Sequence, residues 1–260
     1  MYLDKILAQH REVASRDTRS LTDLIVVAKK IKKNGESRGF AKRLIEDSQQ
    51  QLAVIAEVKR RSPSRGALSH DLQPDLVARQ YQQAGASCIS VLTDSEFFGG
   101  STQDLQLARN ATNLPVLRKD FTVSLHDICD AKIMSADCVL LIVAALDKVE
   151  LEQFHSFAQE LKLDVLVEVH DEAELELALE IGASIVGVNQ RDLKTFEVDQ
   201  QRAVRMAKKI PTNVLRIAES GVKTRKDAQQ LRDAGYHAIL VGESLVTADN
   251  IATTLSDLRV

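Results

Sequence analysis

The chain has 260 residues, of which 44% are hydrophobic, and its formal net charge at pH 7 is -3. This length suits one large α/β barrel or two small domains, and the hydrophobic content is enough for a sizeable core. The slightly acidic balance argues against a general nucleic-acid binder and against a protein of the membrane surface.

Cysteine usage and hydropathy indicate a soluble protein of the cytoplasm. No apolar run approaches the ~18 residues that a membrane span needs, and the charged N-terminus lacks the apolar stretch of a signal peptide. The three cysteines at 88, 129 and 138 show no disulfide or metal-ligand spacing, which suits a reducing compartment. The six histidines show no metal-binding spacing either, so we expect no metal site.

Residues 1–50 have a helical pattern. Apolar side chains recur at helical intervals, first at Leu3 and Ile6 and later at Leu24 and Ala28. We expect these helices either to close the bottom of the following domain or to cover its side.

Eight short apolar segments follow, and each is long enough for a buried strand. We predict strands near residues 53–58, 88–92, 115–119, 138–143, 164–168, 185–189, 214–219 and 238–241. The steps between them leave room for one helix each, and Asp171 with Glu174 has the spacing of a capping box before one such helix. The chain is therefore predicted to be a single (β/α)8 TIM barrel over residues 1–260, with 1–50 as an N-terminal extension.

The predicted strands end in polar residues or glycine, as the mouth of such a barrel requires. Those ends carry Glu57 and Lys59, Lys119, Glu168, Asn189, Glu219 and Gly242. Charged residues are costly inside a buried strand and useful at its end. Because the carboxyl ends of the barrel strands meet at one face, we expect these groups to surround one small ligand.

The first strand places an acid and a base side by side. Glu57 and Lys59 are two residues apart, so strand alternation puts them on the same face. Lys119 ends its own strand, and we expect an apolar pocket and neighbouring cations to lower its pKa enough for it to act as an acid near neutrality. Two interior carboxylates, Glu168 and Glu219, form a network with the lysines that leaves one carboxylate free as a base.

An anion site is predicted after the last two strands. Ser220 and Gly221 follow one strand, and Gly242 and Glu243 follow the other, where barrels commonly bind phosphate through backbone N–H groups. Asn189 is suited to orient a substrate hydroxyl, and Arg191 is suited to bind phosphate through two hydrogen bonds.

Eight segments, in order, resemble the strand-end segments of the indole-3-glycerol phosphate synthase family. They are EVKRRSPSRG, VLTDSEFFGGS, VLRKDF, LLIVAAL, LVEVHDEAEL, GVNQRDLKTFEVD, RIAESGV and LVGESL. The resemblance implies a lyase of tryptophan biosynthesis that needs no metal and no cofactor. It implies the conversion of 1-(2-carboxyphenylamino)-1-deoxyribulose 5-phosphate to indole-3-glycerol phosphate, carbon dioxide and water.

The resemblance also implies roles for individual residues. Lys119 is implied as the general acid on the ribulose carbonyl, and Glu168 as the base for dehydration, with Glu57 and Lys59 as rival candidates for that later step. Glu219 and Asn189 are implied to hold the lysines and the substrate hydroxyls. The implied phosphate site consists of Lys59, Arg191, Gly221, Gly242 and Glu243, with Ser62 and Ser220 nearby. The implied apolar slot for the aryl ring consists of Pro63, Phe98, Phe121 and Leu140.

In this family the N-terminal extension partly covers the active-site face, so a lid formed by residues 1–50 is the alternative to a bottom plug.

Two other functions stay open at this point. The chain is either another phosphate-binding barrel, such as a sugar-phosphate isomerase, or a non-catalytic scaffold that binds a phosphorylated metabolite. We expect a small phosphorylated substrate, no nucleic-acid or membrane partner, and a monomer, with a weak homodimer as the alternative.

Overall fold

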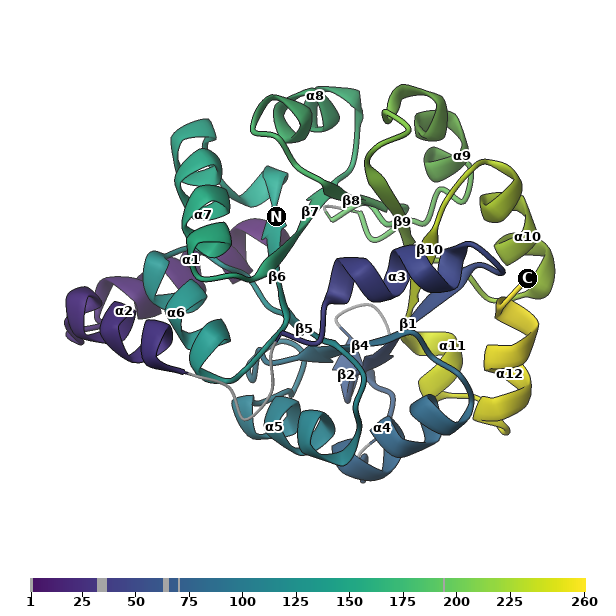
Figure 1. Ribbon diagram of the computed structural model, residues 1–260, viewed down its shortest axis with the longest axis horizontal. Coiled ribbons are helices and arrows are strands. Elements are labelled where there is room, and N and C mark those ends of the chain that lie inside the picture. The colour runs from purple at the N-terminus through teal and green to yellow at the C-terminus, as the bar shows by residue number, and fades with distance from the viewer. Residues whose placement is uncertain (1, 32–36, 63–65, 70, 194) are drawn as a thin grey trace.

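The computed structural model describes residues 2–31, 37–62, 66–69, 71–193 and 195–260. Its barrel strands are β1 (Ala53–Val58), β4 (Cys88–Leu92), β5 (Val116–Lys119), β6 (Cys138–Ile142), β7 (Asp164–Val169), β8 (Ile185–Asn189), β9 (Leu215–Glu219) and β10 (Ala238–Val241). They form a closed parallel barrel in the order β1-β10-β9-β8-β7-β6-β5-β4, which Figure 1 shows end on. The predicted strands and the (β/α)8 architecture are confirmed, and no predicted strand boundary is more than one residue from the observed one.

Helices surround the barrel on its outer side (Figure 1). They are α4 (Pro74–Gln83), α5 (Thr102–Ala111), α6 (Leu125–Ile133), α7 (Lys148–Glu160), α8 (Glu172–Glu180), α9 (Arg202–Met206), α10 (Arg225–Asp233), α11 (Glu243–Val246) and α12 (Ile251–Leu258). A short hairpin, β2 (Arg61–Ser62) with β3 (Gly66–Ala67), follows β1. In the part of the chain that the structure describes, no helix is long and apolar enough to cross a membrane.

Each barrel strand contributes alternate side chains to two separate hydrophobic clusters. In β6, Cys138, Leu140 and Ile142 belong to the cluster inside the barrel, whereas Val139 and Leu141 belong to the cluster between barrel and helices. Burial on both faces explains why the strands read as nearly continuous apolar runs. The alternation also fixes which strand-end residues point into the barrel.

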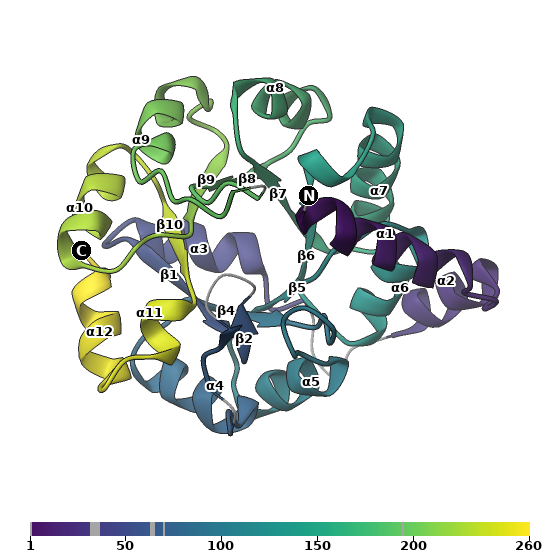
Figure 2. The same ribbon diagram turned by 180° about the vertical axis from the view of Figure 1, so that it is seen from behind.

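The N-terminal extension occupies both ends of the barrel. Helix α3 (Phe40–Ser48) crosses the end that faces the viewer in Figure 1, and its Phe40 and Leu44 are fully buried in the interior cluster. Helix α1 (Tyr2–Ser15) lies over the opposite end, as Figure 2 shows, and α2 (Leu21–Lys30) packs beside α6. The two alternatives drawn from the sequence therefore apply to different helices, because α3 closes the bottom and α1 covers the other face.

The start of α3 depends on a side chain from the barrel. Its N-cap is Gly39, which supplies no side-chain cap, and the Ala41 N–H instead donates to Asp164 Oδ2 at 2.9 Å. Asp164 begins β7 and is itself partly buried, and this burial raises its pKa. The contact therefore replaces an N-cap and fixes the plug to the barrel wall.

We predict that Asp164→Ala lowers the free energy of unfolding by about 1–2 kcal/mol, because it removes this acceptor from a helix N-terminus. Urea unfolding measures the change. Asp164→Asn is the matched control, since its amide oxygen can still accept the hydrogen bond, and it should lose less. Equal stability of Asp164→Ala and the wild type would show that α3 needs no cap from the barrel.

Candidate active site

One cavity of about 500 Å³ lies at the carboxyl ends of the barrel strands. Every described residue that the sequence assigned to the site lines it: Glu57, Lys59, Ser62, Phe98, Lys119, Phe121, Leu140, Glu168, Asn189, Arg191, Glu219, Ser220, Gly221, Gly242 and Glu243. Pro63 lies outside the described residues. Groups that are far apart in the sequence therefore meet around one space, as predicted.

Strand alternation explains this convergence. Leu117 and Leu166 belong to the cluster inside the barrel, so Lys119 and Glu168, each two residues further along, also point inward. The interior residues Ile55 and Ile217 stand in the same relation to Glu57 and Glu219, and Asn189 lies four residues, also an even number, beyond the interior residue Ile185.

Lys119 lies between two buried carboxylates from β7 and β9. Its Nζ is 2.7 Å from Glu168 Oε2 and 3.2 Å from Glu219 Oε2. Asn189 Nδ2 donates to the other oxygen of Glu168 at 3.0 Å. Both glutamates are only 1% exposed, so these contacts are made away from bulk water.

The expectation of a lowered pKa for Lys119 is wrong. Burial lowers its pKa, but the charges of Glu168, Glu219 and Glu57 outweigh that effect and the pKa lies well above its ordinary value. The sequence argument assumed neighbouring cations, whereas the nearest charged groups are carboxylates. Lys119 is therefore held as a charged ammonium group at neutral pH.

The two carboxylates beside Lys119 are not equivalent. Burial raises the pKa of Glu168, but Lys119 and His170 outweigh this and hold the pKa below its usual range. Burial raises the pKa of Glu219, and the negative charge of Glu168 raises it further. Glu219 Oε1 has no hydrogen-bond partner among the described residues, which agrees with a poorly solvated anion. Glu168 is thus the more readily ionised member of the pair.

Gly187 is a determinant of this network that the sequence interpretation missed. It lies within β8, and a Cβ at this position would overlap Glu219 Oε1 and come within 3.0 Å of Leu166 Cδ1. A glycine inside an otherwise apolar strand is the signal that could have identified it, because such glycines often mark a close approach.

The predicted pair on β1 is present and faces Gly242. Lys59 Nζ is 2.5 Å from Glu57 Oε1. A Cβ at Gly242 would overlap that carboxylate oxygen and lie 3.0 Å from Lys59 Nζ, so only glycine leaves room for the pair here. The glycine after β10 therefore lets the backbone approach the ammonium group of Lys59 closely.

The loops after β8 and β9 add hydroxyl, glycine and guanidinium groups to the cavity. Ser220 and Gly221 both have positive φ, of 67° and 78°, so the chain turns sharply after β9. Arg191 Nη1 donates to the Phe196 carbonyl at 3.0 Å, and the Arg191 amide donates to Asn189 Oδ1 at 3.0 Å. The loop after β8 is thereby held over the cavity.

Aromatic residues line the opposite side. The rings of Phe98 and Phe121 have centroids 6.3 Å apart and planes inclined by 37°. Leu140, from the interior cluster, also faces the cavity. The three side chains form an apolar wall of the kind that receives a planar ring.

Several lining residues were not predicted from the sequence. They are chiefly Tyr2, Leu3 and Ile6 of α1, and Leu193, Phe196 and Val198 of the loop after β8. The Tyr2 ring contacts the Phe196 ring edge-on, with centroids 5.0 Å apart. Helical or strand periodicity could not show that these two segments meet, because the contact depends on loop conformation.

His170 supports Glu168 from the loop after β7. Its Nε2 is 3.5 Å from Glu168 Oε1, and its Nδ1 is 3.0 Å from Glu174 Oε2. Asp171 caps α8 as predicted by accepting from the Glu174 amide, but Glu174 contacts His170 instead of completing the capping box. Burial lowers the pKa of His170, but the two carboxylates raise it to about 9.

This raised pKa predicts a pH-dependent stability. The stabilising charge of His170 is fully present below its unfolded pKa of about 6.5 and is lost as pH rises through about 9. His170→Gln should therefore lower the free energy of unfolding by roughly 2–3 kcal/mol at about pH 6 and by much less at about pH 10. Urea unfolding at both pH values measures the difference. His126→Gln, at a ring that contacts the Arg19 carbonyl, is the control. An equal loss at both pH values would contradict the charged state of His170.

One group among the described residues brings three metal-ligand atoms within 4.8 Å, namely His10, Asp94 and Asp120. Their atoms already bond one another and nearby backbone and side-chain donors, so we interpret the group as a hydrogen-bond network. The expectation that the protein needs no metal stays a prediction.

Comparison with known proteins finds related sequences and a similar fold. A family model described as indole-3-glycerol phosphate synthase matches residues 3–258. The protein of that name from Polaromonas sp. (strain JS666) is 43% identical to this chain, over 98% of this chain and 97% of that protein. The protein of that name from Chloroherpeton thalassium is 48% identical, over 77% of each chain. A thiamine phosphate pyrophosphorylase from Pyrococcus furiosus has a similar fold, with a TM-score of 0.60 at 15% identity, over 81% of this chain and 95% of that one.

Proposed function

The chain belongs to the indole-3-glycerol phosphate synthase family, and on this premise we propose how its strand-end residues divide the reaction. It is a carboxy-lyase of tryptophan biosynthesis. It closes the five-membered ring of 1-(2-carboxyphenylamino)-1-deoxyribulose 5-phosphate, then removes carbon dioxide and water to leave indole-3-glycerol phosphate. Membership of this family removes the alternatives of a sugar-phosphate isomerase and a non-catalytic scaffold.

Lys119 is the general acid of the ring closure. The observation that carries this role is the position of its ammonium group, which points into the cavity and is held by Glu168 at 2.7 Å and by Glu219 at 3.2 Å. When its proton passes to the ribulose carbonyl oxygen, the carbonyl carbon becomes electrophilic and the aryl ring carbon attacks it. The two carboxylates restrict the ammonium group to one position, so little reorganisation is needed during the step.

Glu168 is the base of the dehydration. It is buried and oriented by Asn189 and His170, and it can accept a proton from the ring after carbon dioxide has left. The hydroxyl then leaves as water with a proton from a lysine ammonium group of the cavity. Glu57 and Lys59 are the rival pair for this step, because they line the same cavity and contact each other at 2.5 Å. Glu219 holds Lys119 in place.

The substrate phosphate binds where the loops after β8, β9 and β10 meet. Lys59 and Arg191 supply positive charge there, and Gly221, Gly242 and Glu243 supply backbone N–H groups, with Ser62 and Ser220 close by. The aryl ring binds against Phe98, Phe121 and Leu140. Fixing both ends brings the reacting carbons together, an effect that can contribute ~7–11 kcal/mol in favourable cases.

The chain acts as a single barrel domain, with α1 as a lid over the cavity. Tyr2, Leu3 and Ile6 line the cavity from above, which supports this role. We expect the protein to act in the cytoplasm and to bind neither nucleic acid nor membrane. The cavity is lined by residues of one chain, which supports a monomer.

The activity is tested by product fluorescence. The chain contains no tryptophan, so indole emission that appears on adding substrate reports product alone. Purified wild-type protein should give emission that rises until the substrate is consumed. A folded protein that gives no emission would contradict the assignment.

Competition tests the phosphate site. We predict that inorganic phosphate raises KM without changing kcat, because it occupies the anion end of the cavity. Initial rates at several phosphate concentrations, compared with chloride at equal ionic strength, separate binding from general screening. Unchanged KM at tens of millimolar phosphate would place the substrate anion elsewhere.

A further inference from the structure

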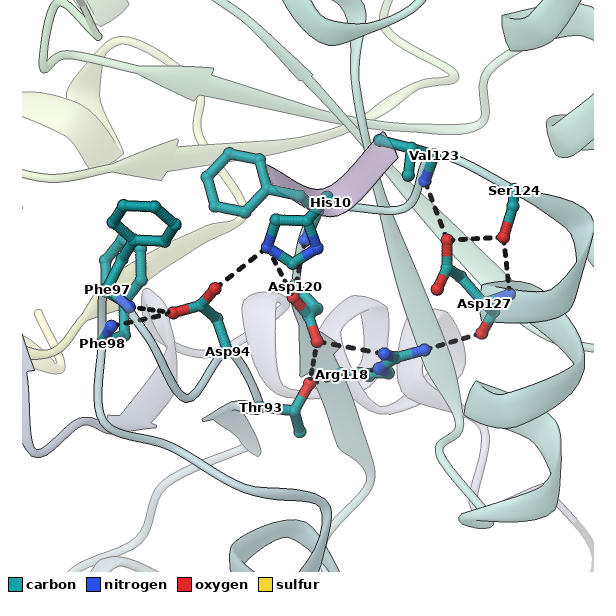
Figure 3. Close-up of polar contacts among 11 residues, drawn as sticks. His10, Thr93, Asp94, Phe97, Phe98, Arg118, Asp120, Val123, Ser124 and Asp127 are labelled. Atoms are coloured by element: carbon teal, nitrogen blue, oxygen red, sulfur yellow. Dashed lines mark hydrogen bonds and ion pairs between the residues drawn. The ribbon is translucent and has the colours of Figure 1, made fainter. Parts of the chain in front are cut away.

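His10 of α1 lies between two loops at the edge of the cavity, just outside the barrel. Its Nε2 donates to Asp94 Oδ2 at 2.9 Å and lies 3.9 Å from Asp120 Oδ1 (Figure 3). Asp94 lies between β4 and α5, and Asp120 directly follows β5, so one imidazole joins three segments of the chain. Both aspartates are buried, with 6% and 7% exposure, so water contributes little to balancing their charges.

Each aspartate holds the backbone of an aromatic residue. Asp94 Oδ1 accepts hydrogen bonds from the amides of Phe97 at 2.6 Å and Phe98 at 2.9 Å. Asp120 Oδ1 accepts from the amide of Phe121 at 2.9 Å. Moving either carboxylate would therefore move one wall of the apolar slot.

Among the described residues, His10 is the side chain that contacts both aspartates. Asp120 Oδ2 accepts from the Thr93 hydroxyl and from Arg118 Nη2, and Arg118 Nη1 continues to the Asp127 carbonyl (Figure 3). The His10 ring also packs on Phe121, with centroids 5.3 Å apart. His10 thus bonds Asp94, which holds the Phe98 backbone, and packs directly on the Phe121 ring.

We propose that His10 is a positioning residue whose imidazolium joins Asp94 to Asp120 and thereby sets the spacing of Phe98 and Phe121 for the aryl ring of the substrate. This inference rests on the proposed function, because it assigns the ring of that substrate to the slot. It gives α1 a specific task, which is to shape the aryl end of the cavity from outside the barrel.

The charge on His10 makes the role testable by pH. The groups that face it are Asp94, Asp120 and, from α6, Asp127. Burial lowers the pKa of His10, but the hydrogen bond to Asp94 and the charges of the three aspartates raise it above its ordinary value. The imidazolium is therefore complete below about pH 6.5 and is lost as pH rises through the raised pKa. KM should be lowest on the acid side and should rise as His10 loses its proton.

The test uses two replacements of His10. His10→Gln keeps a hydrogen-bond donor for Asp94 but carries no charge, so at about pH 6.5 its KM should be about fivefold to tenfold above wild type, with kcat changed less than about twofold. His10→Lys keeps a positive charge, so at about pH 9 its KM should fall below that of the wild type. His126→Gln is the matched control on α6 and should follow the wild type at both pH values.

Two results would overturn the proposal: a KM for His10→Gln equal to wild type at about pH 6.5, or a fall in kcat as large as the rise in KM. If His10→Gln does not fold, Asp94→Asn tests the same link and should raise KM in the same way. Failure of the proposed function is separate, because it appears as absent turnover in the wild type. Inhibition by inorganic phosphate should be unchanged in His10→Gln, since the phosphate end lies across the cavity.

Discussion

Lys119→Ala should abolish indole formation while leaving the protein folded. We expect kcat to fall by at least about 10³-fold, because the variant loses both the proton donor and the positive charge at the developing alcohol. KM should stay within about tenfold, since the phosphate and aryl ends of the substrate are held by other residues. Product fluorescence measures both constants.

Lys148→Ala is the matched control for this prediction. Lys148 is an exposed lysine that pairs with Glu180 at 2.6 Å on the outer helices, and its replacement should leave kcat unchanged. Turnover by Lys119→Ala at a rate near wild type would show that another group protonates the carbonyl.

Replacing the two carboxylates beside Lys119 should have unequal effects. Glu168→Gln removes the ionised base, and we expect kcat to fall by about 10²–10³-fold. Glu219→Gln should lower kcat less than about tenfold near neutral pH, because burial and the charge of Glu168 raise the pKa of Glu219 and glutamine resembles its protonated form. Steady-state kinetics on both variants measures the difference. Equal losses would mean that the two carboxylates share the ionised role.

The pH dependence of kcat provides a second test of the Glu219→Gln variant. Its folded pKa is raised, so the wild-type site changes charge as pH rises through that value, whereas Glu219→Gln cannot. The kcat profile of the variant should therefore lose the corresponding inflection on the alkaline side. A wild-type inflection that persists in the variant belongs to another group.

The barrel and its catalytic face could be predicted because strand alternation is a strong constraint. A charged residue that ends a buried apolar run, as Lys119 and Glu168 do, is costly inside the barrel wall and is therefore expected at the end of the strand. Once the strands close into a barrel, the same parity in each strand sends these ends to one cavity. The resemblance to a known family then supplied the roles that geometry alone leaves open.

Properties that depend on nearest neighbours could not be predicted. The predicted direction of the Lys119 pKa shift was wrong. The sequence does not show that carboxylates from β7 and β9 lie within about 3 Å of its ammonium group. The same reason explains why Gly187 was missed, since its importance depends on Glu219 from the adjacent strand.

The N-terminal helices illustrate a second limit. Periodicity predicted helices in residues 1–50, but it could not assign α3 to one end of the barrel and α1 to the other. That division depends on contacts distant in sequence, such as Ala41 with Asp164 and His10 with Asp94. Only the folded chain shows that a single extension both plugs the barrel and reaches its active face.

The order of proton transfers can be tested in one experiment on Glu168→Gln. In a single turnover, carbon dioxide release reports ring closure and decarboxylation, and indole emission reports the completed dehydration. If Lys119 acts first and Glu168 acts last, this variant should release carbon dioxide at least about tenfold faster than it forms indole, while the two signals coincide in the wild type. Loss of both signals together in Glu168→Gln, with their separation found in Glu57→Gln instead, would contradict that order.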